Sequence, residues 1–587
     1  MIAIGNFSAK LITMRYFPVL LLIMVLFSAP ALCQTYITHV NLLDVEKMKM
    51  LPDQTVVFEK DKITQAGPSK RINVPAGAQV INGTGKYLMP GLVDAHVHFF
   101  QSGGLYTRPD AIDLRKYRPY EKEIEWAHQN MEDFLRRYAQ SGITSVVDVG
   151  STVNFLKQRD SFRTKTYAPA VYMTGPLLTT WEPAVFKNLQ NDEPFSEMKT
   201  EEDARKYVQQ QLPFKPDFIK IWYIVLDQNT EAGARKLLPL VQAVIDESHK
   251  NNLRVAVHAT ERITAQLAVE SGCDFLVHGI DDEIVKDDFV QLLKKKNVVL
   301  CPTLVVADNY GEVFSQRYEL SYLDYTKANA TTLSSLFDLR HLPDTTLINR
   351  YKTFMINRTA AQQKTDSILR ANTKKLVDAG VIIATGTDAG NIGTLHASSY
   401  WEELQAMRET GFSMWQLLQA STINGAKAAG KEKEFGSIQA GKRADLLLLN
   451  ANPLDSIANW RKIAAVINKG VQLQHDSLIA ETPLALVQRQ VNAYNGHDLE
   501  AFLEPYAEDV EIYQFPNTLQ IKGKEAMRKT YQFITQTPTL QCEIQSRIVQ
   551  GNVVIDHERV RFGNQYGTAV AVYHIEGGKI KKVYFIY

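Results

Sequence analysis

Beyond Gly91 the chain repeats one kind of unit: a short, continuous apolar run followed by an amphipathic stretch. Strands that are apolar along their whole length are buried on both faces, as in a parallel sheet covered by helices. The number and span of the units predict an α/β fold, a closed (β/α)8 TIM barrel over residues 89–429. The apolar runs are TSVVDVG, DFIKIWYIV, LRVAVHA, DFLVHG, VVLCPTLVV and VIIATGTDAG.

One stretch interrupts this alternation. Residues 306–375 have helical periodicity and no strand signal, which fits either a helical insertion over the barrel mouth or a long crossover. Because barrel chemistry lies in the loops at the carboxyl ends of the strands, we favour a lid-like insertion.

The two flanks of the predicted barrel are rich in short β runs separated by turns. Residues 34–88 and 430–478 share this character, and we expect them to pair into one small β-sandwich. A further α+β unit follows at 484–587, with Pro483 in the first turn of its first helix and a Gly577-Gly578 hairpin turn near its end.

The first 33 residues have the form of a secretory signal. Lys10 and Arg15 precede the apolar run FPVLLLIMVLF, and small residues follow it, so we expect cleavage after Cys33. A transmembrane anchor is the alternative, but the run is shorter than the roughly 20 apolar residues that crossing requires. Met14 is an alternative start, since Met14 to Cys33 is a complete signal. We therefore predict an exported protein, periplasmic or secreted.

Charge and cysteine usage narrow the partners. The formal net charge of +1 gives no electrostatic case for nucleic acid, nor for a membrane surface once the signal is removed. Cys273, Cys301 and Cys542 are far apart and odd in number, so they are expected to be core residues without a disulfide framework.

The sharpest chemical signal is His96 and His98 in GLVDAHVH. Residues i and i+2 of a strand point to the same face, so both imidazoles can reach one point. A single histidine on an apolar strand is usually a hydrogen-bonded core residue, but two in register indicate a metal site.

Other strands of the series end in side chains that can also bind metal: Lys220, His258, His278 and Asp388. Lys220 in DFIKIWY either reaches the barrel rim or pairs with an acid, or becomes an oxygen ligand by carboxylation. A barrel brings its strand ends to one region, where nitrogen and carboxylate donors suit zinc or a neighbouring first-row metal.

Taken together, these motifs resemble the amidohydrolase superfamily, in its imidazolonepropionase-like and prolidase-like branch. The resemblance rests on PGLVDAHVH, the DFIKI lysine, the two later histidines, GTDAG and NGAKAAG … GSIQAGKRADLLLLNANPL, and covers about residues 35–473. It implies a barrel flanked by a β-sandwich and two divalent cations, zinc by preference. His96, His98 and Asp388 would hold one cation, His258 and His278 the other, and carboxylated Lys220 would bridge them.

The resemblance also implies a reaction, the cleavage of a carbon–nitrogen bond in a small amide, dipeptide or cyclic amide by a metal-bridging hydroxide. Asp388 would be the catalytic proton shuttle. Tyr223 and His396 are the candidates for substrate binding, whereas Trp181 and Trp222 are expected to be packing residues.

Residues 484–587 resemble the SnoaL-like family, a helix-plus-curved-sheet cone, through VNAYNGHDLEAFLEPYAEDVEIY, GKEAMRKTY and GGKIKKVYFIY. His497, Asp509 and His557 are candidates to line a cavity in this unit. Its role stays open between assembly, for instance as a homodimer, and ligand capture. Two alternatives to the hydrolase remain: a catalytically silent ligand-binding protein, and an isomerase or lyase acting in this last domain.

Overall fold

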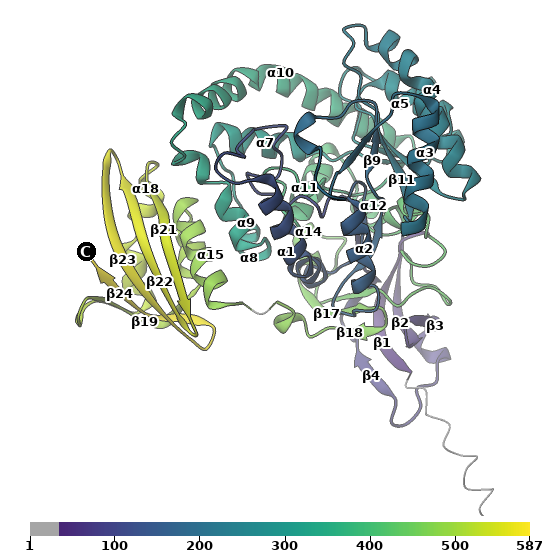
Figure 1. Cartoon of the computed structure of the whole chain (residues 1–587). Coiled ribbons are helices and arrows are strands. Elements are labelled where there is room, and N and C mark those ends of the chain that lie inside the picture. The colour runs from purple at the N-terminus through teal and green to yellow at the C-terminus, as the bar shows by residue number, and fades with distance from the viewer. Residues whose placement is uncertain (1–33, 480) are drawn as a thin grey trace, which may run out of the picture.

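The computed structural model describes residues 34–479 and 481–587 (Figure 1). The predicted signal sequence and both candidate start residues lie outside the described residues. Among the helices of the described part, none has the length and apolar character that crossing a bilayer requires.

Two parallel sheets form the centre of the molecule, one with the order β6-β7-β8 and one with the order β10-β9-β11-β12-β13-β14-β15. Most residues of these strands are buried, as the continuous apolar runs predict, whereas β8, β10 and β15 are only partly buried. The strands of the two sheets are β6 (Leu92–Val97), β7 (Ile143–Asp148), β8 (Ala170–Met173), β9 (Leu177–Thr179), β10 (Phe195–Glu197), β11 (Phe218–Trp222), β12 (Arg254–His258), β13 (Phe275–Val277), β14 (Val299–Cys301) and β15 (Ile382–Ile383).

The two sheets are joined at both ends. On one side, only residues 174–176 separate β8, which pairs with β7, from β9, which pairs with β11. On the other, the segment after β15 returns to β6: Ala95 N donates to Thr385 O at 2.9 Å and His98 N to Ala389 O at 2.8 Å. The strand order is therefore cyclic, and the ends of β6 and β15 lie side by side.

Helices cover the outside of these strands. In α1, the buried side chains Ile124, Ala127, Met131 and Leu135 recur at helical spacing and form one apolar face. The helices are α1 (Tyr120–Gln140), α2 (Val153–Phe162), α3 (Glu201–Gln211), α4 (Thr230–Lys250), α5 (Arg262–Glu270), α6 (Asp287–Lys296), α11 (Ser399–Thr410), α12 (Met414–Ala420) and α13 (Ile423–Ala428).

The two flanks of this α/β unit build one eight-stranded sheet. Figure 1 labels part of it, with β1 to β4 in purple and β17 and β18 in green. Strand β16 pairs antiparallel with β5, which connects the carboxyl-terminal flank to the amino-terminal one. The strands of this sheet are β1 (Thr35–Asp44), β2 (Lys49–Glu59), β3 (Lys62–Pro68), β4 (Gln79–Asn82), β5 (Tyr87–Pro90), β16 (Leu446–Leu449), β17 (Ile463–Asn468) and β18 (Val471–Gln472). The short helix α14 (Ile457–Trp460) lies between β16 and β17 in the chain.

The stretch without a strand signal is helical throughout its regular elements. It forms α7 (Val306–Ser315), α8 (Tyr322–Lys327), α9 (Ala330–Ser335) and α10 (Thr345–Asp378), and α10 arches over the top of the molecule in Figure 1. We refer to residues 306–378 as the helical insertion.

The last unit is a six-stranded sheet, order β20-β19-β24-β23-β22-β21, with four helices. Strands β20 and β21 had no clear sequence signal. The elements are α15 (Pro483–Asn495), α16 (Leu499–Leu503), β19 (Tyr506–Gln514), β20 (Thr518–Lys522), α17 (Lys524–Thr530), α18 (Phe533–Gln536), β21 (Gln541–Gln550), β22 (Val553–Phe562), β23 (Gln565–Glu576) and β24 (Lys579–Ile586).

Helix α15 packs this unit against the helical insertion, beside α9 and α8 (Figure 1). Asn492 Nδ2 donates to the carbonyl of Ala330 at 2.7 Å, and Gln488 Nε2 donates to Ser334 Oγ at 3.0 Å. The last unit therefore makes direct side-chain contacts with the helical insertion, in addition to its connection through the chain.

Candidate metal centre

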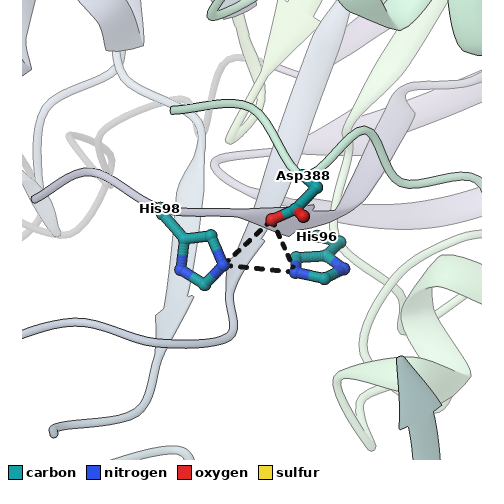
Figure 2. Close-up of side chains that lie close together, drawn as sticks. All are labelled: His96, His98 and Asp388. Carbon is teal, nitrogen blue, oxygen red and sulfur yellow. Dashed lines mark hydrogen bonds and ion pairs between the residues drawn. The ribbon is translucent and has the colours of Figure 1, made fainter. Parts of the chain in front are cut away.

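Three buried side chains converge where β6 ends beside the segment that follows β15. His96 Nε2 and His98 Nε2 lie 3.2 Å apart, and each lies close to Asp388 Oδ1, at 3.1 and 3.0 Å respectively (Figure 2). The two histidines share a strand face, as their i, i+2 spacing predicts. Asp388 reaches them from a backbone in the left-handed region, at φ 61°.

The protonation of this cluster suits a cation. His98 Nδ1 lies 2.8 Å from the Gly150 carbonyl, which can only accept, so Nδ1 is the nitrogen that donates and Nε2 is the one that faces the cluster. Burial lowers the pKa of His96 to about 4, so this ring is neutral near pH 7. Asp388 Oδ1 is buried and has no hydrogen-bond donor of good geometry. Three electron-pair donors that face one another at about 3 Å are the arrangement that a divalent metal ion satisfies.

The other predicted ligands lie next to this cluster. The rings of His96 and His278 are 4.9 Å apart between centroids, and those of His278 and His258 are 4.4 Å apart. His278 Nδ1 is hydrogen-bonded to Thr303 Oγ1 at 2.8 Å. Nε2 is therefore the nitrogen of this ring that can offer an electron pair to a metal. Burial lowers the pKa of both His258 and His278 well below the usual value. Neutral imidazoles are the form that binds metal.

Lys220 is 1 % exposed, on β11. Burial lowers the pKa of its amine to about 7, although the charge of Asp388 acts in the opposite direction. A neutral amine at pH 7 is a nucleophile, which is the form that carboxylation by CO2 requires. The burial of Lys220 does not fit a side chain that reaches out to solvent, whereas its lowered pKa is compatible with carboxylation.

A clamp fixes the two ligand-bearing segments to each other. Asp94 on β6 accepts hydrogen bonds from Thr387 N at 3.1 Å, Thr387 Oγ1 at 2.9 Å and His96 N at 3.3 Å. These bonds join the backbone that precedes Asp388 to the backbone of His96, so the carboxylate and the imidazole are held in register. Sequence reasoning missed Asp94, although its i−2 spacing from His96 places it on the same strand face.

The structure gives the two expected substrate residues internal partners. Tyr223 is buried, and its hydroxyl donates to the Ala234 carbonyl of α4. His396 accepts at Nδ1 from Tyr138 OH at 3.1 Å and donates at Nε2 to Gln101 O at 2.9 Å. Both side chains thus have internal hydrogen-bond partners in this structure, and their contacts to substrate stay predictions.

The aromatic side chain that lies beside the cluster is Trp222, whereas its neighbour Tyr223 was the substrate-binding candidate expected from the sequence. The Trp222 ring lies 5.9 Å from that of His258, edge to face, and 6.0 Å from that of Trp181, which is 37 % exposed. The signal was present in the sequence, because Trp222 is two residues from Lys220 and shares its strand face, whereas Tyr223 is three residues away.

The last domain contains a cavity of about 370 Å3. Of the residues expected there, His497 bonds the Leu540 carbonyl, Asp509 pairs with Lys581 at the surface, and His557 is exposed, so none lines it. Its buried acid is instead Glu558, which accepts from Tyr573 OH at 2.8 Å and whose pKa burial raises to about 7. Cys542 also lines the cavity, and the cysteines at 273, 301 and 542 are free and buried, as predicted.

Relatives of known sequence are similar over most of the chain, though distantly. A 5-methylthioadenosine/S-adenosylhomocysteine deaminase of Carboxydothermus hydrogenoformans is 22 % identical over 78 % of this chain and 93 % of its own length. An imidazolonepropionase of Alkaliphilus metalliredigens is 22 % identical over 70 % of this chain and 88 % of its own. Other matches are partial: the one to the Syntrophomonas wolfei deaminase spans 31 % of that protein.

Solved structures share the fold. The ochratoxinase of A. niger aligns with a TM-score of 0.56 at 18 % identity, covering 75 % of this chain and 95 % of the other. A Xaa-Pro dipeptidase aligns with a TM-score of 0.54 at 21 % identity, covering 75 % and 99 %.

Family models match both parts of the chain. The SnoaL-like domain model matches residues 487–583, and the Amidohydrolase family model matches residues 87–473, more than half of the chain. The cluster of two histidines and an aspartate lies at the ends of strands in the part that the Amidohydrolase family model matches. The protein therefore belongs to the amidohydrolase family, whose members are hydrolases that act on carbon–nitrogen bonds, and a SnoaL-like domain follows the hydrolase unit in the chain.

Proposed function

We propose that this protein is an exported, metal-dependent hydrolase that cleaves a carbon–nitrogen bond in a small amide, dipeptide or cyclic amide. The observation that carries the proposal is the convergence of His96 Nε2, His98 Nε2 and Asp388 Oδ1 at 3.0 to 3.2 Å, where all three atoms offer electron pairs. The cyclic order of the parallel strands supports a closed (β/α)8 barrel with this cluster at the carboxyl ends of the strands.

The ligand set divides between two cations, zinc by preference. His96, His98 and Asp388 would hold one cation and His258 and His278 the other, with Lys220 as a carboxylated bridge. When bound, such ions lower the pKa of a shared water to about 7 and polarise the substrate carbonyl.

Asp388 is suited to move the proton. Burial raises the pKa of this carboxyl, but the imidazoles beside it, that of His96 foremost, outweigh this effect and hold the pKa well below the usual value. Asp388 is therefore ionised at neutral pH and can accept a proton. Because Oδ1 faces the two histidines, Oδ2 is the oxygen that would take a proton from water and deliver it to the leaving nitrogen.

The substrate would lie against an aromatic wall. Trp222 and the part-exposed Trp181 border the His258 side of the cluster. The proteins that this chain resembles carry the names of deaminases, imidazolonepropionases, a dipeptidase and an ochratoxinase. We therefore propose a panel of dipeptides, N-acyl amino acids and cyclic amides, each in an aliphatic and an aromatic version.

The decisive experiment combines metal analysis with a proton-shuttle variant. Protein purified without added metal should contain close to two metal ions per chain, and Asp388→Asn should lose hydrolysis by a factor of about 100 to 10,000, the range for general acid–base catalysis. Asp509→Asn, at an exposed carboxylate of the last domain, is the matched control and should keep full activity. Metal-loaded protein whose hydrolysis survives Asp388→Asn would refute the mechanism.

The cavity of the last domain supports a second candidate function. The cavity of about 370 Å3 with Glu558 at its wall could hold the chemistry of an isomerase or lyase, or capture a ligand while the metal site stays silent. Glu558→Gln separates the two, because it should leave amide hydrolysis intact under the first proposal and abolish turnover under the second.

Export, the small-molecule substrate and a homodimer are further parts of the proposal. Cell fractionation should find the mature chain, beginning at Gln34, outside the cytoplasm, and light scattering should give its mass in solution. Mature protein that keeps residues 1–33 would argue for the anchor.

A further inference from the structure

The segment that follows Asp388 is a tight loop held from two sides. Gly103 N donates to Gly390 O and Gly393 N donates to Gly103 O, both at 2.9 Å, so the β6–α1 connection pins one side. Asn309 Nδ2 of α7 donates to Thr394 Oγ1 at 3.3 Å, so the helical insertion touches the other. The loop that carries the proposed proton shuttle is thus shared by two separate parts of the chain.

Asn391 stands at the centre of these contacts. Its Oδ1 accepts from Arg108 Nη1 at 2.5 Å and from Tyr310 OH at 2.8 Å, and its Nδ2 donates to the backbone carbonyl of Asp388 at 3.1 Å. The side chain is 3 % exposed. The amide oxygen has two lone pairs for these two donors, and the amide nitrogen supplies the third hydrogen bond.

The two donors are fixed in different ways. Arg108 is held through Nε and Nη2 by Asp110, at 2.8 and 2.6 Å, so its guanidinium cannot turn away from Asn391. Tyr310 belongs to α7 of the helical insertion, and its ring packs on Phe314 at 5.8 Å. Its hydroxyl is the group by which the insertion reaches Asn391, one hydrogen bond from the backbone of Asp388.

The backbone of Asp388 needs such support. Its φ of 61° lies in the left-handed region, which a residue other than glycine occupies only when its surroundings hold it there. The carbonyl of Asp388 is the atom that Asn391 holds. A rotation about the N–Cα bond of Asp388 would move this carbonyl and the carboxylate together, and so take the carboxylate away from the two histidine nitrogens.

We propose that Asn391 is a positioning residue through which the helical insertion, by way of Tyr310, and the β6–α1 connection, by way of Arg108, set the orientation of Asp388. This inference rests on the proposed function, since it assigns Asp388 to metal binding and proton transfer. It also gives the insertion a defined role, because its docking on the barrel completes the geometry of the metal centre.

The test compares Tyr310→Phe and Asn391→Ala with Tyr318→Phe. Tyr318 is a matched control because it lies in the same insertion and its hydroxyl donates to a backbone carbonyl, that of Leu336. The first readout needs no substrate: the visible absorption of the cobalt-loaded protein reports the ligand geometry, and chelator competition gives the cobalt affinity. The second is kcat and KM on a substrate from the proposed panel of amides.

Tyr310→Phe should change the cobalt spectrum and lower kcat about three- to tenfold with KM within about twofold of wild type, the effect of one hydrogen bond on a group that acts in the transition state. Asn391→Ala should do the same more strongly, and Tyr318→Phe should do neither. Thermal unfolding of Tyr310→Phe should match that of the control, which keeps the inference testable should Asn391→Ala fail to fold.

Two results would overturn the inference: a cobalt spectrum and kcat of Tyr310→Phe equal to those of Tyr318→Phe, or wild-type protein that binds no cobalt. If wild type binds cobalt but hydrolyses nothing in the panel, the proposed function fails by itself. The cobalt spectra of the variants still decide whether Asn391 positions Asp388.

Discussion

A buried glutamate contacts the backbone where the helical insertion begins, and a pH dependence of folding stability follows from it. Glu403 on α11 is fully buried, and its Oε2 accepts from the backbone of Leu304 at 2.7 Å and Val305 at 3.2 Å. Its Oε1 has no partner. Burial raises the pKa of Glu403 to about 8, beyond what these two hydrogen bonds and the more distant charge of Arg370 offset, while Asp94 raises it further.

The direction of the effect follows from linkage. The ordinary pKa of this carboxyl is 4.5, so between pH 4.5 and about 8 the folded chain keeps a proton that the unfolded chain has lost. Folding stability therefore falls as pH rises through this window, by about 1.4 kcal/mol per pH unit and about 5 kcal/mol in all. Glu403→Gln keeps an oxygen for the two backbone donors and has no proton to lose, so this pH dependence should disappear.

The assay measures the free energy of unfolding of wild type and Glu403→Gln by urea at pH 6 and pH 9. The variant should gain about 3 kcal/mol on wild type between the two conditions, because the part of the window above pH 6 contributes that amount. Any fixed cost of the buried amide cancels in this difference. Glu409→Gln, at an exposed position of the same helix, should show no such gain. Equal differences at pH 6 and pH 9 would mean that Glu403 is ionised in the folded protein and that the reasoning is wrong.

Two further predictions concern the substrate and the domain contact. Trp222→Ala should raise KM about tenfold or more for the aromatic amides of the panel but little for the aliphatic ones. An aromatic contact of this kind contributes up to about 1.5 kcal/mol beyond its buried area. Equal KM changes for both classes of amide would exclude a binding role for Trp222. Asn492→Ala leaves the buried Ala330 carbonyl without its donor, which costs about 1–3 kcal/mol. Limited proteolysis near residue 480 should then become faster, whereas Gln545→Ala, at an exposed position of β21, should leave the rate unchanged.

Much of the fold was predictable because its signals are local. Continuous apolar runs give buried parallel strands, and the α/β class and the family resemblance are both confirmed. Strand β8 was missed because AVYM is short, and β21 because QCEIQSRIVQ mixes polar and charged residues with few apolar ones. Such strands form because neighbours supply hydrogen bonds and burial, which one segment of sequence does not display.

In the candidate site, too, the features with a local sequence signal were predictable and those that depend on distant segments were not. The pairing of His96 with His98 follows from strand periodicity alone, and the structure brings Asp388 to them from nearly 300 residues away. The expectations for Tyr223 and His396 relied on nearness in sequence to a ligand. In the structure the Tyr223 hydroxyl contacts α4, and the His396 ring packs on Phe99, with ring centroids 5.3 Å apart and nearly parallel planes. Whether either side chain contacts substrate stays a prediction.

The role of the last domain follows from the apolar cluster that it shares. One continuous cluster contains Val487 of α15, Leu333 and Val313 of the helical insertion, and Ile392 and Leu395 of the loop after Asp388. Burying apolar surface is the dominant favourable term in such packing, so the insertion and the loop after Asp388 are stabilised partly by contacts with the last domain. The contact geometry therefore gives the domain at least one structural role inside the catalytic unit, whatever its own cavity binds.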